Sequence, residues 1–291
     1  MRYEGMIFRP PSEADSLILQ ATIGCSHNRC TFCGSYKQKR FRIRSLNEIE
    51  RDLDEVRPYA ALVRRVFLAD GDALIVPQRM LAPMLESIRA ALPGVERIGV
   101  YGNTKSILRK SPEELAALRQ LGLGIVYLGA ESGDQEILDR VRKGTCLDDT
   151  AAAIARVKAA GILISVSVVL GLGGVERSQI HAQRTGQFLA RAQPDFAAAL
   201  SVTVVPGTPL AEEEAKGAFT VPDAYMLLQE LHTMLSEIEG GHMFFASNHA
   251  SNYLPIKGWI PEEKQKMLET IEYVLRARDP WLLRPEYLRG L

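Results

Sequence analysis

Six short apolar runs, rich in β-branched residues, alternate with longer segments of helical periodicity over the first 210 residues. The runs are residues 17–23, 66–69, 97–101, 125–128, 162–170 and 196–204. The helical segments are residues 46–56, 77–91, 112–121, 135–141, 150–160 and 178–192. Short buried strands separated by helices of about ten to fifteen residues are typical of parallel sheets built from right-handed βαβ units. We therefore predict an α/β protein whose residues 1–210 form a partial (β/α)₆ TIM-like barrel.

The composition changes after residue 210. Residues 211–217 are charged and linker-like, and residues 221–240 and 261–277 carry amphipathic helical patterns. A short apolar piece, residues 243–246, lies between these two patterns. We expect residues 211–291 to form a mainly helical extension that closes the mouth of the barrel.

Charge and length exclude several classes of protein. The 35 Lys and Arg residues equal the 35 Asp and Glu residues, so no electrostatic footprint for nucleic acid or membrane is present. The longest apolar run, residues 161–174, is too short to span a membrane. Four cysteines make no secreted disulfide scaffold, and the N-terminus shows no signal peptide. We expect a cytoplasmic protein without a membrane partner.

Three of the four cysteines, Cys25, Cys30 and Cys33, fall within nine residues, directly after the first predicted strand. A barrel enzyme places its chemistry in such strand-end loops. Three close thiolates favour a metal or iron–sulfur centre over a disulfide framework. A zinc site of these cysteines with His27 is the alternative, but His27 lies between two of the ligands, where coordination would be cramped. A [4Fe–4S] cluster held by three cysteines leaves one iron open for chemistry.

The other five predicted strands also end in small or polar residues. These strand ends are residues 70–72, 102–104, 129–133, 171–174 and 205–209. Small residues permit a close approach between backbone and ligand, and parallel strands of a barrel bring their carboxyl ends together. Each motif alone is more typical of a turn than of a site. Their order behind the cysteines indicates a shared binding site.

With these motifs the chain resembles the radical S-adenosylmethionine (radical SAM) superfamily over roughly residues 15–210. The resemblance rests on the cysteine loop, with Phe32 directly before Cys33, and on the order of the strand-end motifs. Residues 129–133 and 205–210 look most like the branch of oxygen-independent coproporphyrinogen oxidases and Elongator-type tRNA-modifying enzymes. The cysteine spacing, Cys-x4-Cys-x2-Cys, is one residue longer than the usual pattern of the superfamily.

The resemblance implies that Cys25, Cys30 and Cys33 bind three irons of an oxygen-sensitive [4Fe–4S] cluster, and that the open iron takes SAM. It also implies cleavage of SAM to methionine and a 5′-deoxyadenosyl radical, which abstracts hydrogen from a substrate. The electron would come from a donor such as flavodoxin or ferredoxin.

The resemblance further implies which strand-end residues contact SAM. Phe32 would lie near the adenine, and the acidic motif at Asp70 would receive the methionyl amino group. Glu131 would serve the ribose or the carboxylate, and Gly171 would line the adenine pocket. The complete implied set is Phe32, Asp70, Gly71, Asp72, Asn103, Glu131, Ser132, Gly171, Gly173 and Val205.

The substrate is not evident from the sequence, and a small molecule is favoured over tRNA because the charge is balanced. Formation of a 3-amino-3-carboxypropyl radical is an alternative chemistry, and a zinc-stabilised nucleic-acid-binding module is an alternative of another class. Asn248, His249 and Asn252 are weak candidates for substrate contacts, weighed equally against a hydrogen-bonded loop.

Two further features are interpreted as structural. The basic run at residues 37–44 is expected to balance the cluster loop or to pair with acids such as Glu48 and Glu50 rather than to bind nucleic acid. Cys146 is expected to be a packed small residue, because a cysteine outside a metal site or disulfide is usually buried and inert.

Overall fold

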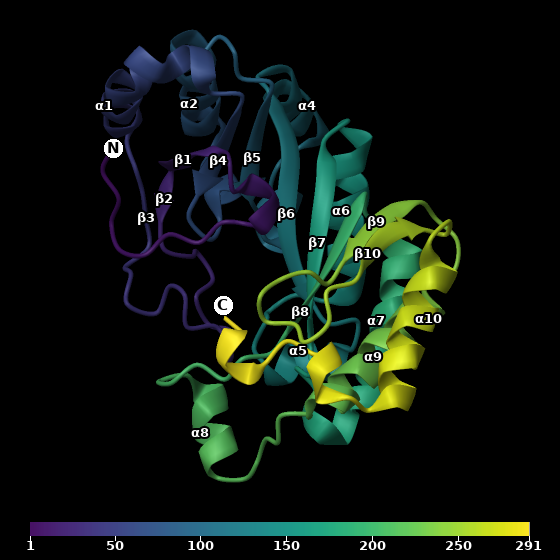
Figure 1. Ribbon diagram of the computed structural model, residues 1–291. Coiled ribbons are helices and arrows are strands. Elements are labelled where there is room, and N and C mark those ends of the chain that lie inside the picture. Colours follow the sequence, from purple (N-terminus) through teal and green to yellow (C-terminus); the bar gives the residue numbers. More distant parts are fainter. Residues whose placement is uncertain (291) are drawn as a thin grey trace. The chain divides into compact units, whose positions relative to one another are not determined.

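The structure, a computed structural model, describes residues 1–290 and divides into two compact units (Figure 1). Unit 1 comprises Met1–Asn28, Ser35–Leu128 and Ala152–Ile164. Unit 2 comprises Arg29–Gly34, Gly129–Ala151 and the chain from Ser165 onward. Within residues 1–290, no helix has the length and apolar composition needed to cross a membrane.

Unit 1 is built on parallel strands that pair in the order β1 (Leu17–Gln20), β4 (Arg65–Ala69), β5 (Arg97–Tyr101) and β6 (Leu123–Glu131), of which the part up to Leu128 belongs to this unit. A separate antiparallel pair joins β2 (Thr22–Ile23) to β3 (Arg42–Ile43). The helices are α1 (Leu46–Val56), α2 (Gln78–Ala91), α3 (Thr104–Leu108), α4 (Pro112–Gln120) and most of α6 (Leu147–Ala159). Short 3-10 helices lie at Pro11–Glu13, Arg57–Leu62 and Ala73–Ile75.

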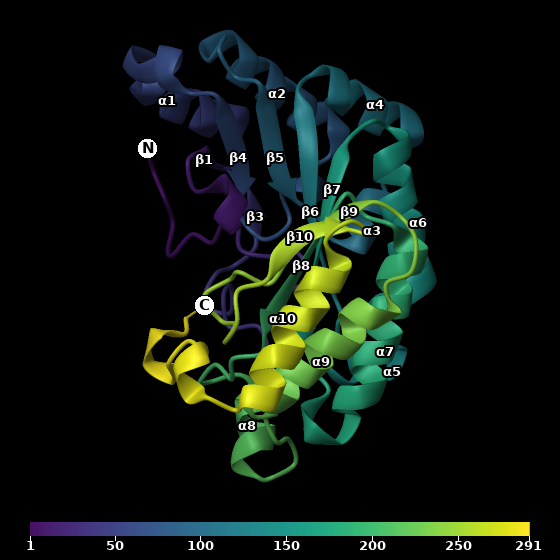
Figure 2. The same cartoon turned by 45° about the vertical axis from the view of Figure 1, so that its right-hand side comes forward.

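The core of unit 1 contains strands that are buried along nearly their whole length, as is typical of parallel sheets covered on both faces. Val66, Leu68, Ile98 and Val100 are fully buried, as are Leu81, Leu85 and Ile88 on one face of α2. Burial of such side chains stabilises the unit by about 1.5–3 kcal/mol each. Figure 2 shows α1, α2 and α4 flanking the strands of this unit.

Unit 2 contains the parallel strands β7 (Leu163–Leu170, from Ser165 onward), β8 (Phe196–Ser201) and β9 (Met243–Ala246), followed by β10 (Lys257–Ile260), which is antiparallel to β9. Its helices are α5 (Gln135–Arg140), α7 (Gly174–Ala192), α8 (Pro209–Ala215), α9 (Ala224–Glu237) and α10 (Lys264–Ala277). The 3-10 helices Pro280–Leu282 and Glu286–Leu288 end the described chain. Helix α9 packs between α7 and α10, as both views show (Figures 1 and 2).

The predicted α/β class is confirmed, and each predicted strand appears. The first run forms two strands, because Leu17–Gln20 pairs with β4 whereas Thr22–Ile23 pairs with β3. Residues 243–260 contribute strands β9 and β10 as well as a loop, so residues 211–290 are less purely helical than expected. Strand β10 has only four residues and contains Gly258, which leaves a weak local signal; pairing with β9 decides its conformation.

Candidate active site

The three clustered cysteines lie in the loop between β2 and β3. Cys25 belongs to unit 1, and Cys30 and Cys33 belong to unit 2. Their side chains are half-buried, and all four cysteines of the chain are thiols rather than disulfides. Three thiols in one strand-end loop are the donor set that an iron–sulfur cluster requires.

Unit 2 fixes the segment between Cys30 and Cys33. The Thr31 N–H donates a hydrogen bond to the Val141 carbonyl at 3.0 Å, and the Thr31 carbonyl accepts one from the Leu210 N–H at 3.1 Å. Phe32 packs against a buried apolar cluster formed by Ile137, Val141, Val169, Leu172, Val202, Leu210 and Phe219. Backbone and ring together therefore hold Cys30 and Cys33 on a rigid base.

Gly34 brings the end of this segment against Val205. A β-carbon added to Gly34 would lie 2.6 Å from Cγ1 of Val205, a distance that no real contact tolerates. Glycine is required here for this close approach. The structure thus places Val205, a predicted SAM contact, beside the residue that follows Cys33.

In unit 1, Asp70 anchors the start of the cysteine loop. Its buried Oδ2 accepts hydrogen bonds from the Gly24 N–H at 2.9 Å, Gln20 Nε2 at 2.9 Å and Lys39 Nζ at 2.8 Å. Gly24 directly precedes Cys25, so the carboxylate fixes the residue next to a predicted ligand. Its other oxygen, Oδ1, is buried and has no hydrogen-bond partner within residues 1–290.

Asp72 joins two further predicted residues. Its carboxylate accepts hydrogen bonds from Asn103 Nδ2 at 2.7 Å and from the Ser26 hydroxyl. Asn103 also caps α3 by accepting from the Ser106 N–H at 2.9 Å. The ends of β4 and β5 and the cysteine loop are therefore tied together around Asp72. Ser26 was not predicted; its place next to Cys25 is the signal that could have indicated it.

Gly71, between the two acids, lies against Cys25. A β-carbon added to Gly71 would lie 2.6 Å from Cε2 of Tyr36 and 3.0 Å from Cβ of Cys25. Any larger residue would displace the tyrosine ring or the cysteine. Within unit 1, the predicted acidic motif is therefore adjacent to one predicted cluster ligand.

In unit 2, Glu131 ends β6 in a left-handed conformation, with φ 68°. Its carboxylate pairs with Lys143 Nζ at 2.7 Å, and both side chains are largely shielded from solvent. The neighbouring Ser132 is buried, and its hydroxyl accepts from the Asp134 N–H at 2.9 Å. Lys143 was not predicted as a site residue, although it lies in a run, residues 142–144, typical of the branch that the chain resembles.

The end of β7 is held by a buried carboxylate that sequence reasoning missed. Glu230, on α9, accepts hydrogen bonds from the Gly171 N–H at 2.7 Å, the Ser178 hydroxyl at 2.6 Å and His181 Nδ1, which lies 2.9 Å away. Gly173 directly precedes α7. Glu230 therefore fixes the turn that carries both predicted glycines, and a lone acid on an apolar helix face was the only available signal.

The three candidate substrate residues follow β9. Asn248 is exposed, His249 is half-buried and Asn252 is buried. Asn252 uses its whole amide, because Nδ2 donates to the Ala199 and Ser247 carbonyls and Oδ1 accepts from the Ser201 hydroxyl. Burial, with a smaller effect of Arg284, lowers the pKa of His249. For Asn252, the contacts favour the hydrogen-bonded-loop interpretation.

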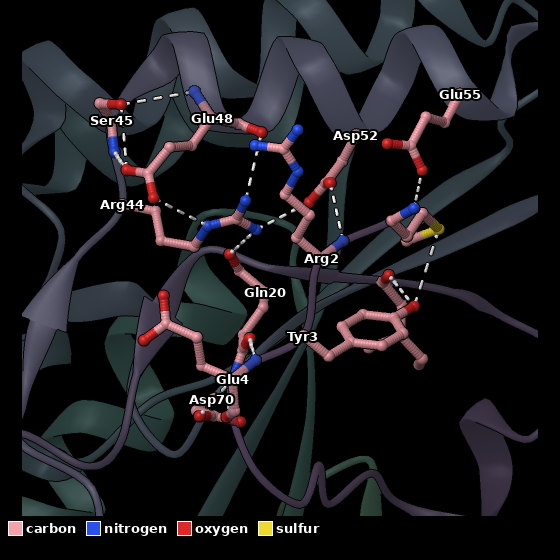
Figure 3. A network of polar contacts seen from close by, with 12 residues as sticks. Arg2, Tyr3, Glu4, Gln20, Arg44, Ser45, Glu48, Asp52, Glu55 and Asp70 are labelled. Carbon is pink, nitrogen blue, oxygen red and sulfur yellow. Dashed lines mark hydrogen bonds and ion pairs between the residues drawn. The ribbon is translucent and has the colours of Figure 1, made fainter.

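The basic run after the cysteine loop has a structural role (Figure 3). Arg44 is buried and pairs with Asp52 at 2.8 Å, and it also donates to the Gln20 carbonyl at 3.0 Å. The expected partner Glu48 pairs with Arg42 at 3.1 Å, whereas the other expected partner, Glu50, accepts instead from the Ser87 hydroxyl.

Glu48 also completes the cap of α1. Burial pushes the pKa of Glu48 upward, but hydrogen bonds from the Ser45 N–H and from Arg42 outweigh it and lower the pKa to about 2.

The expectation for Cys146 is wrong, because its side chain is exposed. Its sulfur accepts from the Asp149 N–H at 3.4 Å, where it satisfies a donor in the first turn of α6 instead of filling a core.

Comparison with known proteins places this arrangement in a family. The sequence profile of the radical SAM superfamily matches residues 19–182, more than half of the chain. The chain belongs to the radical SAM superfamily. The matched segment includes the cysteine loop, the Asp70–Asp72 motif and the Glu131 and Gly171 strand ends.

Two curated proteins are similar to this radical SAM chain. An anaerobic magnesium-protoporphyrin IX monomethyl ester cyclase from Cereibacter sphaeroides is 28% identical over 195 residues, which cover 65% of this chain and 30% of that protein. An uncharacterised methyltransferase from Pyrococcus horikoshii is 25% identical over 198 residues, covering 67% of this chain and 41% of that protein. The chain therefore spans less than half the length of either relative.

Solved radical SAM structures share the fold. Coproporphyrinogen III oxidase from Escherichia coli aligns with a TM-score of 0.60 at 17% identity, covering 78% of this chain and 53% of that one. Methylornithine synthase aligns with a TM-score of 0.54 at 18% identity, covering 79% and 63%. The predicted family is confirmed, and the predicted α/β fold with a mostly parallel sheet is that of these radical SAM structures.

Membership defines the cofactors. Radical SAM enzymes use a [4Fe–4S] cluster and SAM and require a reductant, so this chain is a radical SAM enzyme with these two cofactors. The thiols of the cysteine loop fit the cluster by their donor chemistry, and the buried, unpartnered Oδ1 of Asp70 fits a site for a cationic group such as an amine.

Proposed function

We propose that this enzyme reductively cleaves SAM to a 5′-deoxyadenosyl radical, which abstracts hydrogen from a small-molecule substrate. The observation that carries the proposal is the contact of Gly71 with Cys25, which sets the acidic motif against a cluster ligand. We further propose flavodoxin or ferredoxin as the electron donor and the cytoplasm as the location.

The residues have separate tasks in this proposal. Cys25, Cys30 and Cys33 would hold three irons of a [4Fe–4S] cluster, which, once reduced by the external donor, would supply the electron for the cleavage of SAM. The Asp70–Asp72 motif receives the methionyl amino group, because carboxylate oxygens accept hydrogen bonds from an ammonium. The backbone at Gly171 and Val205 lies along the adenine.

Further unit 2 contacts belong to the same site. Glu131 accepts hydrogen bonds from the ribose, and Lys143, held 2.7 Å from Glu131, supplies a positive charge next to it. Phe32 lies near the adenine while its ring keeps the cysteine segment packed on the unit 2 core. These contacts orient SAM and exclude water around the reacting bond.

A small-molecule substrate is supported by the balanced charge of the chain, with 35 basic and 35 acidic residues, since RNA binding draws on a basic surface. The name of the Cereibacter sphaeroides relative, a protoporphyrin ester cyclase, also denotes a small-molecule substrate. Residues 211–291 are proposed to act as an extension of the 1–210 core that closes the mouth of the barrel.

The test uses anaerobically purified protein and the variant Cys30→Ala, with Cys146→Ala as the matched control because Cys146 is exposed and outside the loop. Wild type and Cys146→Ala should contain about four irons per chain and, after reduction with dithionite, give a [4Fe–4S] EPR signal that changes shape when SAM is added. Cys30→Ala should lose the signal and the formation of 5′-deoxyadenosine together.

Two results would contradict the proposal. Stoichiometric zinc with an iron-free, EPR-silent wild type would mean that the cysteine loop is structural. Full SAM cleavage by Cys30→Ala would mean that the cluster ligands lie elsewhere in the chain.

A further inference from the structure

The loop Ser247–Tyr253, which follows β9, is fixed to the carboxyl end of β8. The Ser201 N–H donates to the Ser251 hydroxyl at 3.0 Å, and the Ser201 hydroxyl donates to Asn252 Oδ1 at 2.8 Å. Strand β8 leads directly to Val205, one of the residues proposed to line the SAM site. The loop therefore lies at the strand end next to which the chemistry is proposed to occur.

Two arginines from the last described residues also hold this loop. Arg284 donates to the His249 carbonyl at 2.9 Å and to the Asn252 carbonyl at 3.0 Å. Arg289 donates to the Ser251 carbonyl at 2.7 Å. Two guanidinium groups thus satisfy three loop carbonyls, which would otherwise require water.

These contacts impose one tautomer on His249. Its Nδ1 accepts a hydrogen bond from the Ser251 N–H at 3.1 Å, and the Ser251 hydroxyl lies 2.9 Å from the same nitrogen. A ring nitrogen that accepts from a backbone amide carries no proton, so the proton of the neutral imidazole resides on Nε2. Within residues 1–290, Nε2 has no hydrogen-bond partner.

The surrounding charge is positive. Arg284 has no carboxylate partner within residues 1–290, whereas Arg289 pairs with Glu286 at 2.7 Å. Burial and the Arg284 charge lower the pKa of His249, so its imidazole is neutral at pH 7 and keeps the Nε2–H donor. An N–H donor on a residue whose carbonyl is bound by a guanidinium without a carboxylate partner favours an anionic oxygen as its own partner.

We propose that His249 binds an anionic oxygen of the substrate, such as a carboxylate, through Nε2–H, and that Ser251 and Arg284 are its positioning residues. The proposal deepens the proposed function and rests on it for the identity of the ligand as substrate. It gives the unidentified substrate a chemical class: a molecule that carries an acidic group some distance from the hydrogen that is abstracted.

The first measurement is the tautomer of His249 in the full-length protein labelled with ¹⁵N at its histidines. Two-bond ¹⁵N–¹H correlation spectra distinguish a protonated from an unprotonated ring nitrogen, and loss of the signal in His249→Phe assigns it. We expect Nδ1 unprotonated and Nε2 protonated at pH 7. An Nδ1–H tautomer or a protonated imidazole would overturn the proposal.

The second measurement uses acetate as the anionic probe and acetamide as its neutral counterpart, at constant ionic strength. Acetate should shift the His249 ring signals saturably, and acetamide should not. A hydrogen bond to a charged group contributes about 1.5–3 kcal/mol, so acetate should bind at least about tenfold more weakly to His249→Phe and to Arg284→Gln when the affinities of all variants are compared by isothermal titration calorimetry, which does not need the ring signal. The control His242→Phe removes an exposed histidine stacked on Trp259 and should bind acetate as wild type does.

Absence of saturable acetate binding to wild type, or equal affinity in all variants, would refute the role of His249. Both measurements are made without SAM and do not use the cluster signal. They can therefore fail while the EPR result holds, and the EPR result can fail while His249 still binds the anion.

Discussion

Replacement of Glu230 by alanine should destabilise unit 2 strongly. Glu230 has 1% of its surface exposed and accepts hydrogen bonds from three groups: the Gly171 N–H, the Ser178 hydroxyl and His181. All three lie within unit 2 and are themselves shielded from water. Removal of the carboxylate leaves these donors without a partner in an apolar space lined by helices α7 and α9.

The magnitude follows from the unpaired donors. Each buried polar group left unsatisfied costs about 1–3 kcal/mol. With three partners losing the carboxylate, we expect Glu230→Ala to lower the free energy of unfolding by about 3–5 kcal/mol. For a chain of this size that corresponds to a fall in the midpoint of thermal unfolding of roughly 10 °C.

The assay is thermal unfolding followed by circular dichroism, with urea unfolding as the second measurement. Ser236→Ala is the matched control, because Ser236 lies on the same helix and its exposed hydroxyl donates only to the His232 carbonyl, at 2.9 Å. Its free energy of unfolding should stay within about 0.5 kcal/mol of the wild-type value. If Glu230→Ala were also within that range, the three hydrogen bonds would not hold the β7 turn as argued.

Two further predictions concern the polar network of unit 1 (Figure 3). Arg44→Ala leaves the buried Asp52 carboxylate uncompensated and should lower the free energy of unfolding in urea by about 3–5 kcal/mol. The control Arg57→Ala breaks an exposed ion pair and should lower it by less than about 1 kcal/mol. Similar losses in the two variants would refute the role of burial. The folded pKa of Glu48, about 2, lies below its ordinary value of 4.5, so its stabilisation is present above pH 4.5 and lost as pH falls toward 2. The stability gap between wild type and Glu48→Gln should therefore close over that window, and a gap constant from pH 5.5 to 2.5 would contradict it.

The strands and their ends were predictable because both depend on local sequence. A buried strand requires a run of apolar, β-branched residues, and a ligand-facing turn requires small or polar ones. The apolar residues of β4 meet the first requirement, and Asp70, Gly71 and Asp72, which follow directly, meet the second. The same local logic placed α1 at Leu46–Val56, where Ser45 and Glu48 form a capping box.

Contacts that join distant segments were not predictable in this way. Glu230 lies 59 residues from Gly171 in the sequence. It is an acidic residue among the apolar residues of α9, and nothing in that segment indicates Gly171 as its partner. The strand character of β10 depends on its pairing with β9, and the exposure of Cys146 depends on where α6 begins. In each case the conformation or exposure of the residue depends on a partner that the fold brings close, and the local sequence around the residue does not indicate that partner.

The acidic motif illustrates why residue type alone does not assign a role. Asp70 and Asp72 are separated by one glycine, yet their carboxylates serve different partners: Asp70 holds Gly24 and Lys39, and Asp72 binds Asn103. The sequence could show that two acids follow a strand, but not that one fixes the chain before Cys25 while the other joins the ends of β4 and β5. Because Gly71 lies against Cys25, both carboxylates are set by the same tight turn, so the motif supports the cysteine loop, and its proposed role in binding SAM depends on that support.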